Sequence, residues 1–411
     1  MARKSKLNFF LVDDDPDMVA LMTDLLVKAG HTVTTTDSTA VALPRILDAR
    51  PDCVMIDLMM PGMDGLELCR ELRAKRDLQS AKFIVISAKP YEFDRKRAYD
   101  VGADGYITKP LNADTFIQQV QRVLEDRVEL TFWGVRGTLP VPGPRSVRYG
   151  GNTSCVTLEF SKGQFFIFDA GTGIKALSDH LMRENRARME AKIFISHPHW
   201  DHINALPFFV PLFVQGNEFE ILGASHGDFT MREMISAQME GVYFPIRLKQ
   251  FGARVYFRDL QEEEFEIDGV TVRTKLLNHP GKCLGYRVEY KGRSICYVTD
   301  NELDLESSHF FNPFYFKRLT RFVEGADVLI TDCTYTDAEY RNRIGWGHSC
   351  VSRVVDLAHQ GKVKTLYLFH HDPDQDDAAI EEKLKAAQGE LRRLKSSTKV
   401  EAPKERQTVK V

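Results

Sequence analysis

Short apolar runs alternate with amphipathic stretches over the first 126 residues of the chain. The runs are only a few residues long, as expected for strands buried on both faces, and the stretches between them carry apolar side chains at helical spacing. We predict strands at 7–12, 32–36, 53–56, 83–86 and 105–107, with helices between them and after the last, for example 17–29 and 113–125. This alternation predicts an α/β domain over residues 1–127, built on a doubly wound, five-stranded parallel sheet.

Strand-like runs dominate from residue 128 onward, and they form two sets. The first set comprises 128–133, 155–160, 165–169, 193–196 and 220–222, with helical stretches at 174–190 and 228–240. The second set comprises 270–276, 283–290, 294–299, 328–331 and 365–369. We therefore predict an α+β domain over residues 128–393 that contains two sheets and several helices. Residues 394–411 are polar, and we expect a disordered tail there.

Composition sets limits on function. The chain has 411 residues, of which 43% are hydrophobic and 27% charged, with a net charge of −3. That balance gives no electrostatic reason to expect nucleic acid or an anionic membrane as a partner. The apolar runs are too short to span a bilayer. The seven cysteines are scattered without a CxxC pair, which is typical of reduced thiols in a cytoplasmic protein.

Charged and hydroxyl side chains stand where the predicted strands of the first domain end. They are Asp13 and Asp14, Asp57, Ser87 and Lys109. In a parallel sheet these ends lie along one edge, so we expect the side chains to meet there. Clustered carboxylates repel one another unless a hard cation neutralises them, and magnesium prefers such oxygen ligands.

This ordered set resembles the receiver domain of two-component response regulators over the whole segment. The motifs are Val12-Asp13-Asp14-Asp15, the run from Ile56-Asp57 to Asp64-Gly65, Ile86-Ser87-Ala88 and Thr108-Lys109-Pro110. The resemblance implies that Asp57 accepts a phosphoryl group from a sensor histidine kinase or a phosphotransfer protein. It also implies a magnesium site formed by Asp13, Asp14, Asp57 and the Met59 carbonyl. The switch that responds to phosphorylation would be formed by Ser87, Tyr106 and Lys109. The alternative is a degenerate receiver that serves only for dimerisation.

The run His197-Pro198-His199-Trp200-Asp201-His202 is the most informative stretch of the chain. It places four metal-binding side chains directly after an apolar run at 192–196, so a buried strand delivers them to one point. Imidazoles and a carboxylate suit zinc, manganese or iron. A histidine-rich surface loop is the alternative, and further ligand-type residues downstream argue against it.

These residues resemble the metallo-β-lactamase superfamily over residues 128 to about 390. The motifs are Asp169-Ala170-Gly171-Thr172-Gly173, the histidine run, Asn278-His279, Thr299-Asp300 and Phe369-His370-His371. The resemblance implies an αββα sandwich and two divalent metals, most simply zinc, with manganese or iron as alternatives. One metal would be bound by His197, His199 and His279, and the other by Asp201, His202 and His370. Asp300 would bridge the two, and Asp169 would orient a ligand histidine.

The late motif Gly345-Trp346-Gly347-His348-Ser349 looks like that of ribonuclease Z and its phosphodiesterase relatives. The resemblance implies that His348 protonates the leaving group, with Asp332 as a candidate orienting partner. A capping or core histidine is the alternative reading of His348. Arg136 or Arg148, near the glycines of 133–154, could contact a phosphate.

Substrate size is suggested by a departure from ribonuclease Z, whose basic, glycine-rich arm has no counterpart here. The apolar residues of 206–213 and 243–245 instead suggest a wall or lid over a cleft. We therefore predict a response regulator whose output is a phosphodiesterase acting on a small phosphodiester, such as a cyclic nucleotide or dinucleotide, with nucleic acid disfavoured. A thioester or lactone hydrolase and a non-catalytic metal-binding signalling protein remain as alternatives. A homodimer is suggested by analogy with other receivers.

Overall fold

The computed structural model describes residues 6–60, 64–89, 92–184, 186 and 188–411. Part of the glycine-containing motif after Asp57, residues 61–63, lies outside this range. The chain divides into two compact units. One reaches to Val128 and also includes Glu159–Gln164, and the other comprises Glu129–Leu158 and Phe165–Val411.

The first unit is a parallel sheet with the strand order β2-β1-β3-β4-β5, as predicted. Its strands are β1 Asn8–Val12, β2 Thr32–Thr36, β3 Cys53–Asp57, β4 Lys82–Ser87 and β5 Gly105–Thr108. Its helices are α1 Pro16–Lys28, α2 Thr39–Ala49, α3 Gly65–Arg73, α4 Glu92–Asp100 and α5 Ala113–Leu124.

Both faces of this sheet are buried, because alternate residues of each strand enter different cores. Phe10 and Val54 pack with α2 and α3, whereas Phe9 and Met55 pack with α1 and α5. The central strands β1, β3 and β4 consequently read as nearly continuous apolar runs, and polar side chains gather at their carboxyl ends.

The second unit contains two seven-stranded sheets. The first has the order β11 Arg254–Leu260, β10 Glu218–Ala224, β9 Glu190–Ile195, β8 Phe165–Phe168, β7 Cys155–Glu159, β6 Glu129–Gly134 and β19 Thr408–Lys410. The second has the order β12 Glu264–Ile267, β13 Val270–Leu277, β14 Cys283–Tyr290, β15 Arg293–Val298, β16 Val328–Asp332, β17 Thr365–Phe369 and β18 Lys399–Glu401.

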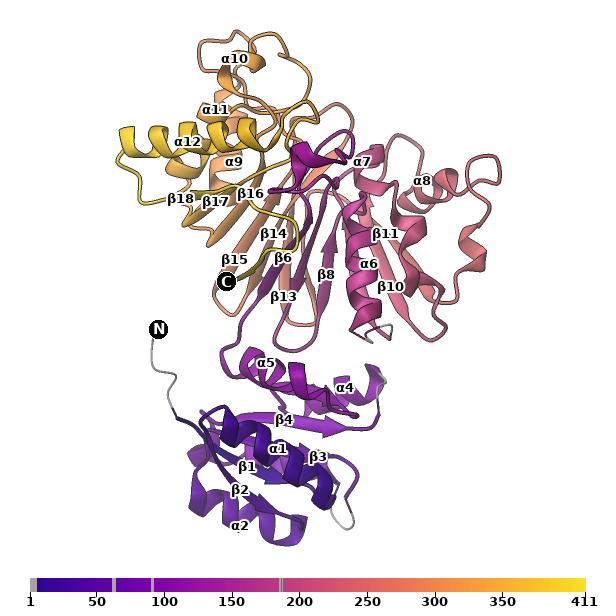
Figure 1. The fold of residues 1–411 in the computed structure, drawn as a ribbon, viewed down its shortest axis with the longest axis vertical. Helices are drawn as coiled ribbons and strands as arrows, with labels where there is room; N and C mark the ends of the chain where they lie inside the picture. The colour runs from indigo at the N-terminus through magenta and orange to yellow at the C-terminus, as the bar shows by residue number, and fades with distance from the viewer. Residues whose placement is uncertain (1–5, 61–63, 90–91, 185, 187) are drawn as a thin grey trace. The chain divides into compact units, whose positions relative to one another are not determined.

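The two sheets pack face to face, and helices cover the outer face of each (Figure 1). Aromatic rings fill the space between the sheets, for example Phe168 against Tyr286 and Tyr297. Helices α6 Gly173–Arg183 and α8 Met231–Gln238 pack on the first sheet. Helices α9 Pro313–Val323, α11 Val351–Gln360 and α12 Asp377–Arg393 pack on the second. Two short helices, α7 Trp200–Ile203 and α10 Asp337–Tyr340, lie in connecting segments. This arrangement is the expected αββα sandwich.

The expectation of a disordered tail is wrong. β18 pairs with β17, and β19 pairs with β6, so the C-terminal residues add an edge strand to each sheet. Val400 and Ala402 are buried, although their neighbours are polar. Side chains alternate between the two faces of a strand, and in these edge strands only one face is buried. The polar composition therefore reflects the exposed face and does not indicate disorder.

A further expectation needs correction. The predicted helix at 174–190 ends at Arg183, and Glu190 begins β9 instead. The apolar segment 206–213 is mainly core, because Leu206, Phe209 and Leu212 pack with α6 and β10. Phe208 is exposed, however, and its ring lies 5.4 Å from that of Phe244, so a wall formed by residues of 206–213 and 243–245 stays a prediction. Within the described residues no helix is long and apolar enough to cross a membrane. All seven cysteines are unpaired and buried.

Candidate functional site

The histidines and aspartates predicted to bind metal come together at the carboxyl ends of strands in the second unit. His197 follows β9, while Asp169, Asp300 and His370 lie within two residues of the ends of β8, β15 and β17. Three of them have left-handed backbone conformations, with φ of 60° at Asp169, 31° at Asp300 and 58° at His370. Such conformations are costly for residues other than glycine, and they concentrate at functional sites.

One group of donors consists of three imidazoles and a carboxylate. His197 Nε2 lies 2.8 Å from His199 Nδ1 and 3.3 Å from Asp300 Oδ2. His279 Nε2 lies 3.2 Å from His199 Nδ1. All four donor atoms fall within 4.8 Å of one another, which is the spacing of ligands around a single cation.

A second group shares Asp300 with the first. His370 Nε2 lies 3.0 Å from Asp300 Oδ1 and 3.1 Å from Asp201 Oδ2. His202 Nε2 lies 3.1 Å from Asp201 Oδ2 and 3.3 Å from Asp300 Oδ2. The two oxygens of one buried carboxylate therefore face both groups, which is the arrangement of a dinuclear metal site.

The hydrogen bonds around the site leave ring nitrogens free to bind a metal. His279 Nδ1 lies 2.9 Å from the Gly347 carbonyl, which can only accept, so Nδ1 carries the proton. His202 Nδ1 lies 2.7 Å from Asp169 Oδ2 in the same way. His202 Nε2 is buried and makes no well-aligned hydrogen bond among the described residues, and the carboxylate oxygens of Asp201 and Asp300 lie 3.1 and 3.3 Å from it. Both Nε2 atoms thus point into the donor groups, where a divalent cation would take the place of a proton, and the residues fit divalent cations.

The charge states of the site's histidines agree with the binding of divalent cations. Burial lowers the pKa of His197 to about 3, so this ring is neutral, as a ligand must be. Burial would also lower the pKa of His370, but Asp300 and Asp201 raise it to about 10. The second group therefore pairs buried carboxylates with positive charge, and a divalent cation would replace the imidazole proton.

Asp169 is held by three donors besides His202. It accepts hydrogen bonds from the Ser196 amide at 2.7 Å, the Ser196 hydroxyl at 2.9 Å and the Tyr297 hydroxyl at 2.7 Å. The carboxylate is fully buried and fixes the orientation of the His202 ring. Sequence reasoning missed Ser196 and Tyr297, because a serine or tyrosine in a strand gives no signal of its own.

The glycine-containing loop after β6 closes the site from one side. The Thr138 amide donates to Asp201 Oδ2 at 2.7 Å. A Cβ atom at Gly137 would collide with the imidazole of His370, so only glycine fits there. The expectation that Arg136 contacts a phosphate is wrong: its side chain is fully buried and donates to the carbonyls of Gly150, Asp372 and Gln375. Arg148 is half-exposed and pairs with Glu381.

His348 lies beside the donor groups and is oriented by a carboxylate. Its Nδ1 is 2.9 Å from Asp332 Oδ2, and its ring stacks on His370 with centroids 5.0 Å apart. Burial would lower the pKa of His348, but Asp332 more than offsets this and raises it. Asp332 is itself held by the Asn301 amide and by Thr334.

Glu302 is a buried residue of this site that the sequence did not reveal. Its carboxylate accepts hydrogen bonds from the Gly345 and Gly347 amides, both at 2.7 Å, and from the Tyr340 hydroxyl at 2.8 Å. It therefore fixes the loop that carries His348 and the carbonyl that orients His279. Its position two residues after Asp300 is the only signal that could have indicated it.

The first unit brings its predicted residues together as well. Asp13, Asp14 and Asp57 form a group with metal-ligand spacing. Lys109 Nζ lies 3.0 Å from Asp13 Oδ2 and 3.1 Å from Asp57 Oδ1. Because a lysine bridges these acids, the edge of the sheet has both a cation site and a charge partner for an added phosphoryl group.

The remaining predicted residues of the first unit lie at the same edge. Ser87 is buried at the end of β4 and its hydroxyl accepts from the Lys89 amide. The Tyr106 hydroxyl donates to the Lys89 carbonyl at 2.7 Å. The Met59 amide donates to Asp57 Oδ2 at 3.3 Å, while a ligand role for the Met59 carbonyl stays a prediction.

The two folds and their clustered residues define a two-part protein, with an acidic phosphorylation-type site in one unit and a His/Asp metal-type site in the other. Known families match both: the response regulator receiver domain matches residues 9–121, and the beta-lactamase superfamily domain matches residues 165–371. The chain belongs to the metallo-β-lactamase superfamily and carries a response regulator receiver domain on the N-terminal side of that domain.

Individual relatives match one part or the other. The transcriptional regulatory protein BaeR of Escherichia coli is 35% identical over 114 residues, which is 28% of this chain and 46% of that protein. The chain thus spans about half the length of the curated relatives it matches. The metallo-beta-lactamase fold protein YhfI of Bacillus subtilis is 17% identical with a TM-score of 0.51, covering 70% of this chain and all of that one. This likeness shows the fold.

Proposed function

We propose that the protein is a two-component response regulator whose output domain is a dinuclear metal-dependent phosphodiesterase. The observation that carries the proposal is the Asp332–His348 pair at 2.9 Å beside the two donor groups. His348 lies outside the two groups assigned to the metals, although with Asp332, Asp300 and His370 it also has metal-ligand spacing, and a buried carboxylate holds it in one orientation. A protonated imidazole in that position suits donation to a leaving alkoxide, a step that the hydrolysis of a phosphodiester requires.

The metal ligands in this proposal are the seven residues of the two donor groups. His197, His199 and His279 would hold one ion, Asp201, His202 and His370 would hold the other, and Asp300 belongs to both groups. Zinc is the simplest choice, because imidazole and carboxylate ligands suit it, and manganese or iron are alternatives. Bound there, two divalent cations lower the pKa of water and neutralise charge on the phosphate.

The chain's own residues complete the reaction. Water adds to phosphorus, one P–O ester bond breaks, and His348 gives its proton to the departing alkoxide; solvent then restores the proton on His348. Asp332 is a positioning residue that keeps Nδ1 protonated and Nε2 directed at the site. The products are an alcohol and a phosphate monoester, and one water molecule is consumed.

The receiver domain supplies the control. A cognate histidine kinase, or a phosphotransfer protein, transfers a phosphoryl group to Asp57, with magnesium bound by Asp13, Asp14 and Asp57. Lys109 then has a new charge partner, and Ser87 and Tyr106 adjust to it. This rearrangement changes hydrolysis in the output domain. A cytoplasmic location follows from such a kinase partner.

The experiment that tests the proposal uses the dependence on the leaving group. A p-nitrophenolate ion leaves without a proton, whereas the alkoxide released from 2′,3′-cyclic AMP needs one. We expect His348→Ala to reduce kcat on 2′,3′-cyclic AMP by about 10²- to 10⁴-fold. The same substitution should reduce kcat on bis(p-nitrophenyl) phosphate much less, with two metals still bound by elemental analysis.

His359→Ala provides the matched control, because His359 lies in α11 and belongs to neither donor group. It should leave both activities at the wild-type level. An equal loss on both substrates in His348→Ala would make His348 a ligand or a structural residue and contradict its assignment as an acid. Failure of the wild-type protein to hydrolyse either diester with two metals bound would contradict the proposed function.

A further inference from the structure

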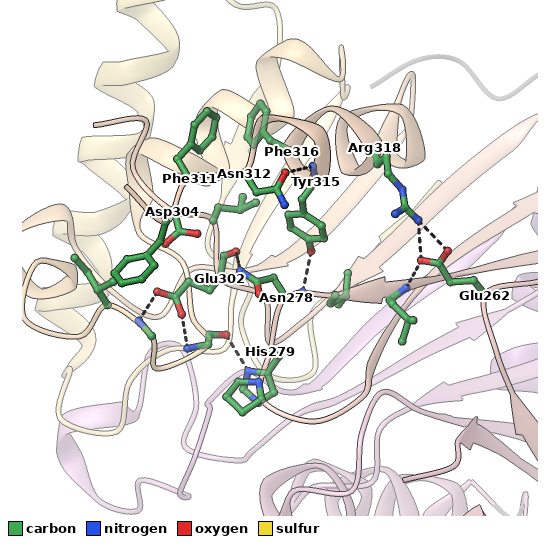
Figure 2. A pocket seen from close by; sticks show the side chains of 18 residues that line it. Glu262, Asn278, His279, Glu302, Asp304, Phe311, Asn312, Tyr315, Phe316 and Arg318 are labelled. Atoms are coloured by element: carbon green, nitrogen blue, oxygen red, sulfur yellow. Dashed lines mark hydrogen bonds and ion pairs between the residues drawn. The ribbon is translucent and has the colours of Figure 1, made fainter. Parts of the chain in front are cut away.

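A cavity of about 890 Å³ opens beside the metal-type site (Figure 2). It shares His279 and Gly347 with that site and extends from them toward α9. The shared histidine presents Nε2 to the donor groups while its other edge bonds to Gly347. A phosphodiester at the donor groups would therefore have one of its two ester groups next to this cavity.

The cavity wall is largely apolar and aromatic. Phe310, Phe311, Tyr315 and Phe316 come from the segment that includes the start of α9, and leucines of β13 lie opposite. Phe310 is 60% exposed, so its ring is available to a bound group. Cavities of this volume bind small organic molecules, and an apolar, aromatic wall suits an apolar or aromatic ligand.

The charge in the cavity is negative. Its acidic side chains are Glu262, Glu302 and Asp304. Of the lining residues that the structure describes, only Arg318 is a lysine or arginine, and it is already paired with Glu262 at 3.0 Å. Burial and the charge of Glu302 raise the pKa of Asp304, as expected where negative charge accumulates.

The three acidic side chains of the cavity differ in how many hydrogen bonds and ion pairs they already make. Glu302 accepts three hydrogen bonds, and Glu262 is paired with both Lys275 and Arg318. One oxygen of Asp304 lies 3.3 Å from the Tyr340 hydroxyl, whose single proton is shared with the nearer Glu302 at 2.8 Å. Asp304 thus has capacity to accept a hydrogen bond from a bound group, and its charge opposes a second anion.

We propose that this cavity binds one ester group of the phosphodiester, an uncharged and largely apolar or aromatic alcohol with hydrogen-bond donors, and excludes a second phosphate. The inference rests on the proposed function and narrows its substrate class. Diesters with a single phosphate are accepted, whereas cyclic dinucleotides and oligonucleotides would have to place another phosphate beside Glu302 and Asp304, which have no lysine or arginine partner among the described lining residues because Arg318 pairs with Glu262. Burying an anion without a partner in such a place is unfavourable.

Two chromogenic substrates test the selectivity of the cavity separately from the proposed phosphodiesterase activity. Thymidine 5′-(p-nitrophenyl phosphate) and the same compound with a 3′-phosphate release the same leaving group and differ only in the additional anion. We expect the 3′-phosphate to lower kcat/KM at least about tenfold in the metal-loaded, full-length protein.

Two substitutions in the cavity should reduce that discrimination. Asp304→Asn removes a negative charge and can still accept from Tyr340, and Ile344→Lys introduces a cation at a half-exposed lining position. We expect each to shrink the ratio of the two kcat/KM values several-fold. Glu306→Gln is the matched control, because it removes a nearby charge outside the cavity lining and should leave the ratio unchanged.

The outcomes distinguish the two claims. Hydrolysis of both thymidine probes with kcat/KM values within twofold of each other would overturn the inference and leave the phosphodiesterase intact. A discrimination that Asp304→Asn and Ile344→Lys do not change would also overturn it, since the charge would then act elsewhere. Absence of turnover on both probes and on bis(p-nitrophenyl) phosphate would instead overturn the proposed function.

Discussion

At the scale of single residues, the site depends on side chains that orient other side chains. Asp169 holds His202, the Gly347 carbonyl holds His279, and Asp332 holds His348. Each of these contacts fixes which ring nitrogen carries the proton, and hence which one faces the site. The ligand-type residues could be named from the sequence because histidine and aspartate at strand ends are conspicuous. Ser196, Tyr297 and Glu302 could not, because their importance comes only from the atoms they contact.

The contact between Gly137 and His370 gives a prediction about metal content. Gly137→Ala forces a methyl group against the His370 ring, so the second donor group cannot keep its geometry. We expect its metal affinity to fall about 10- to 100-fold, measured by titration calorimetry with zinc, while the first group still binds one ion. Gly389→Ala, in α12 where an added Cβ meets no close atom, should bind two ions like the wild type. Two ions of unchanged affinity in Gly137→Ala would show that the loop does not shape the site.

The Asp332–His348 hydrogen bond gives a prediction about rate. Asp332→Asn keeps the shape but cannot accept the Nδ1 proton equally well, so His348 loses its preferred tautomer. We expect kcat on 2′,3′-cyclic AMP to fall by about 10²-fold with little change in KM. The loss on bis(p-nitrophenyl) phosphate should be smaller. A change confined to KM would mean that Asp332 serves substrate binding instead.

At the scale of secondary-structure elements, the buried central strands were predictable and the edges were not. β1, β3 and β4 of the receiver sheet and most central strands of the sandwich are apolar runs, so their positions follow from the sequence, and β2 follows from its run of β-branched residues. β11, β12, β18 and β19 lie at sheet edges and alternate polar with apolar residues over short lengths. Their hydrogen bonds come from pairing with distant segments, which no local pattern reports.

The two C-terminal strands lead to a prediction about stability. Removal of residues 396–411 deletes the partners of β17 and β6, exposes the neighbours of Val400 and breaks the Glu405–Asn152 hydrogen bond. We expect the Tm of the output domain to fall by at least about 4 °C in a calorimetric scan. Glu405→Ala should reproduce part of the loss, and Lys404→Ala, at an exposed position, should not. An unchanged Tm after the deletion would contradict a structural role for these strands.

At the scale of the whole molecule, the chain joins a receiver domain to a hydrolase-type domain, and each has a complete set of candidate residues. The sequence predicted both folds because strand-end motifs identify them. It could not predict the substrate class, because the cavity beside His279 is assembled from β13, α9 and the 344–347 loop. Its negative charge appears only when those segments are brought together.

The central claim is that phosphorylation of Asp57 controls a phosphodiesterase. The most direct test is hydrolysis of bis(p-nitrophenyl) phosphate by zinc- or manganese-loaded protein, with and without beryllofluoride and magnesium. We predict turnover whose rate changes at least about threefold when beryllofluoride occupies Asp57, and no such change in Asp57→Asn, which lacks the acceptor carboxylate. Equal rates with and without beryllofluoride in the wild-type protein would contradict the coupling. Absence of turnover in both states, with two metals bound, would contradict the phosphodiesterase itself.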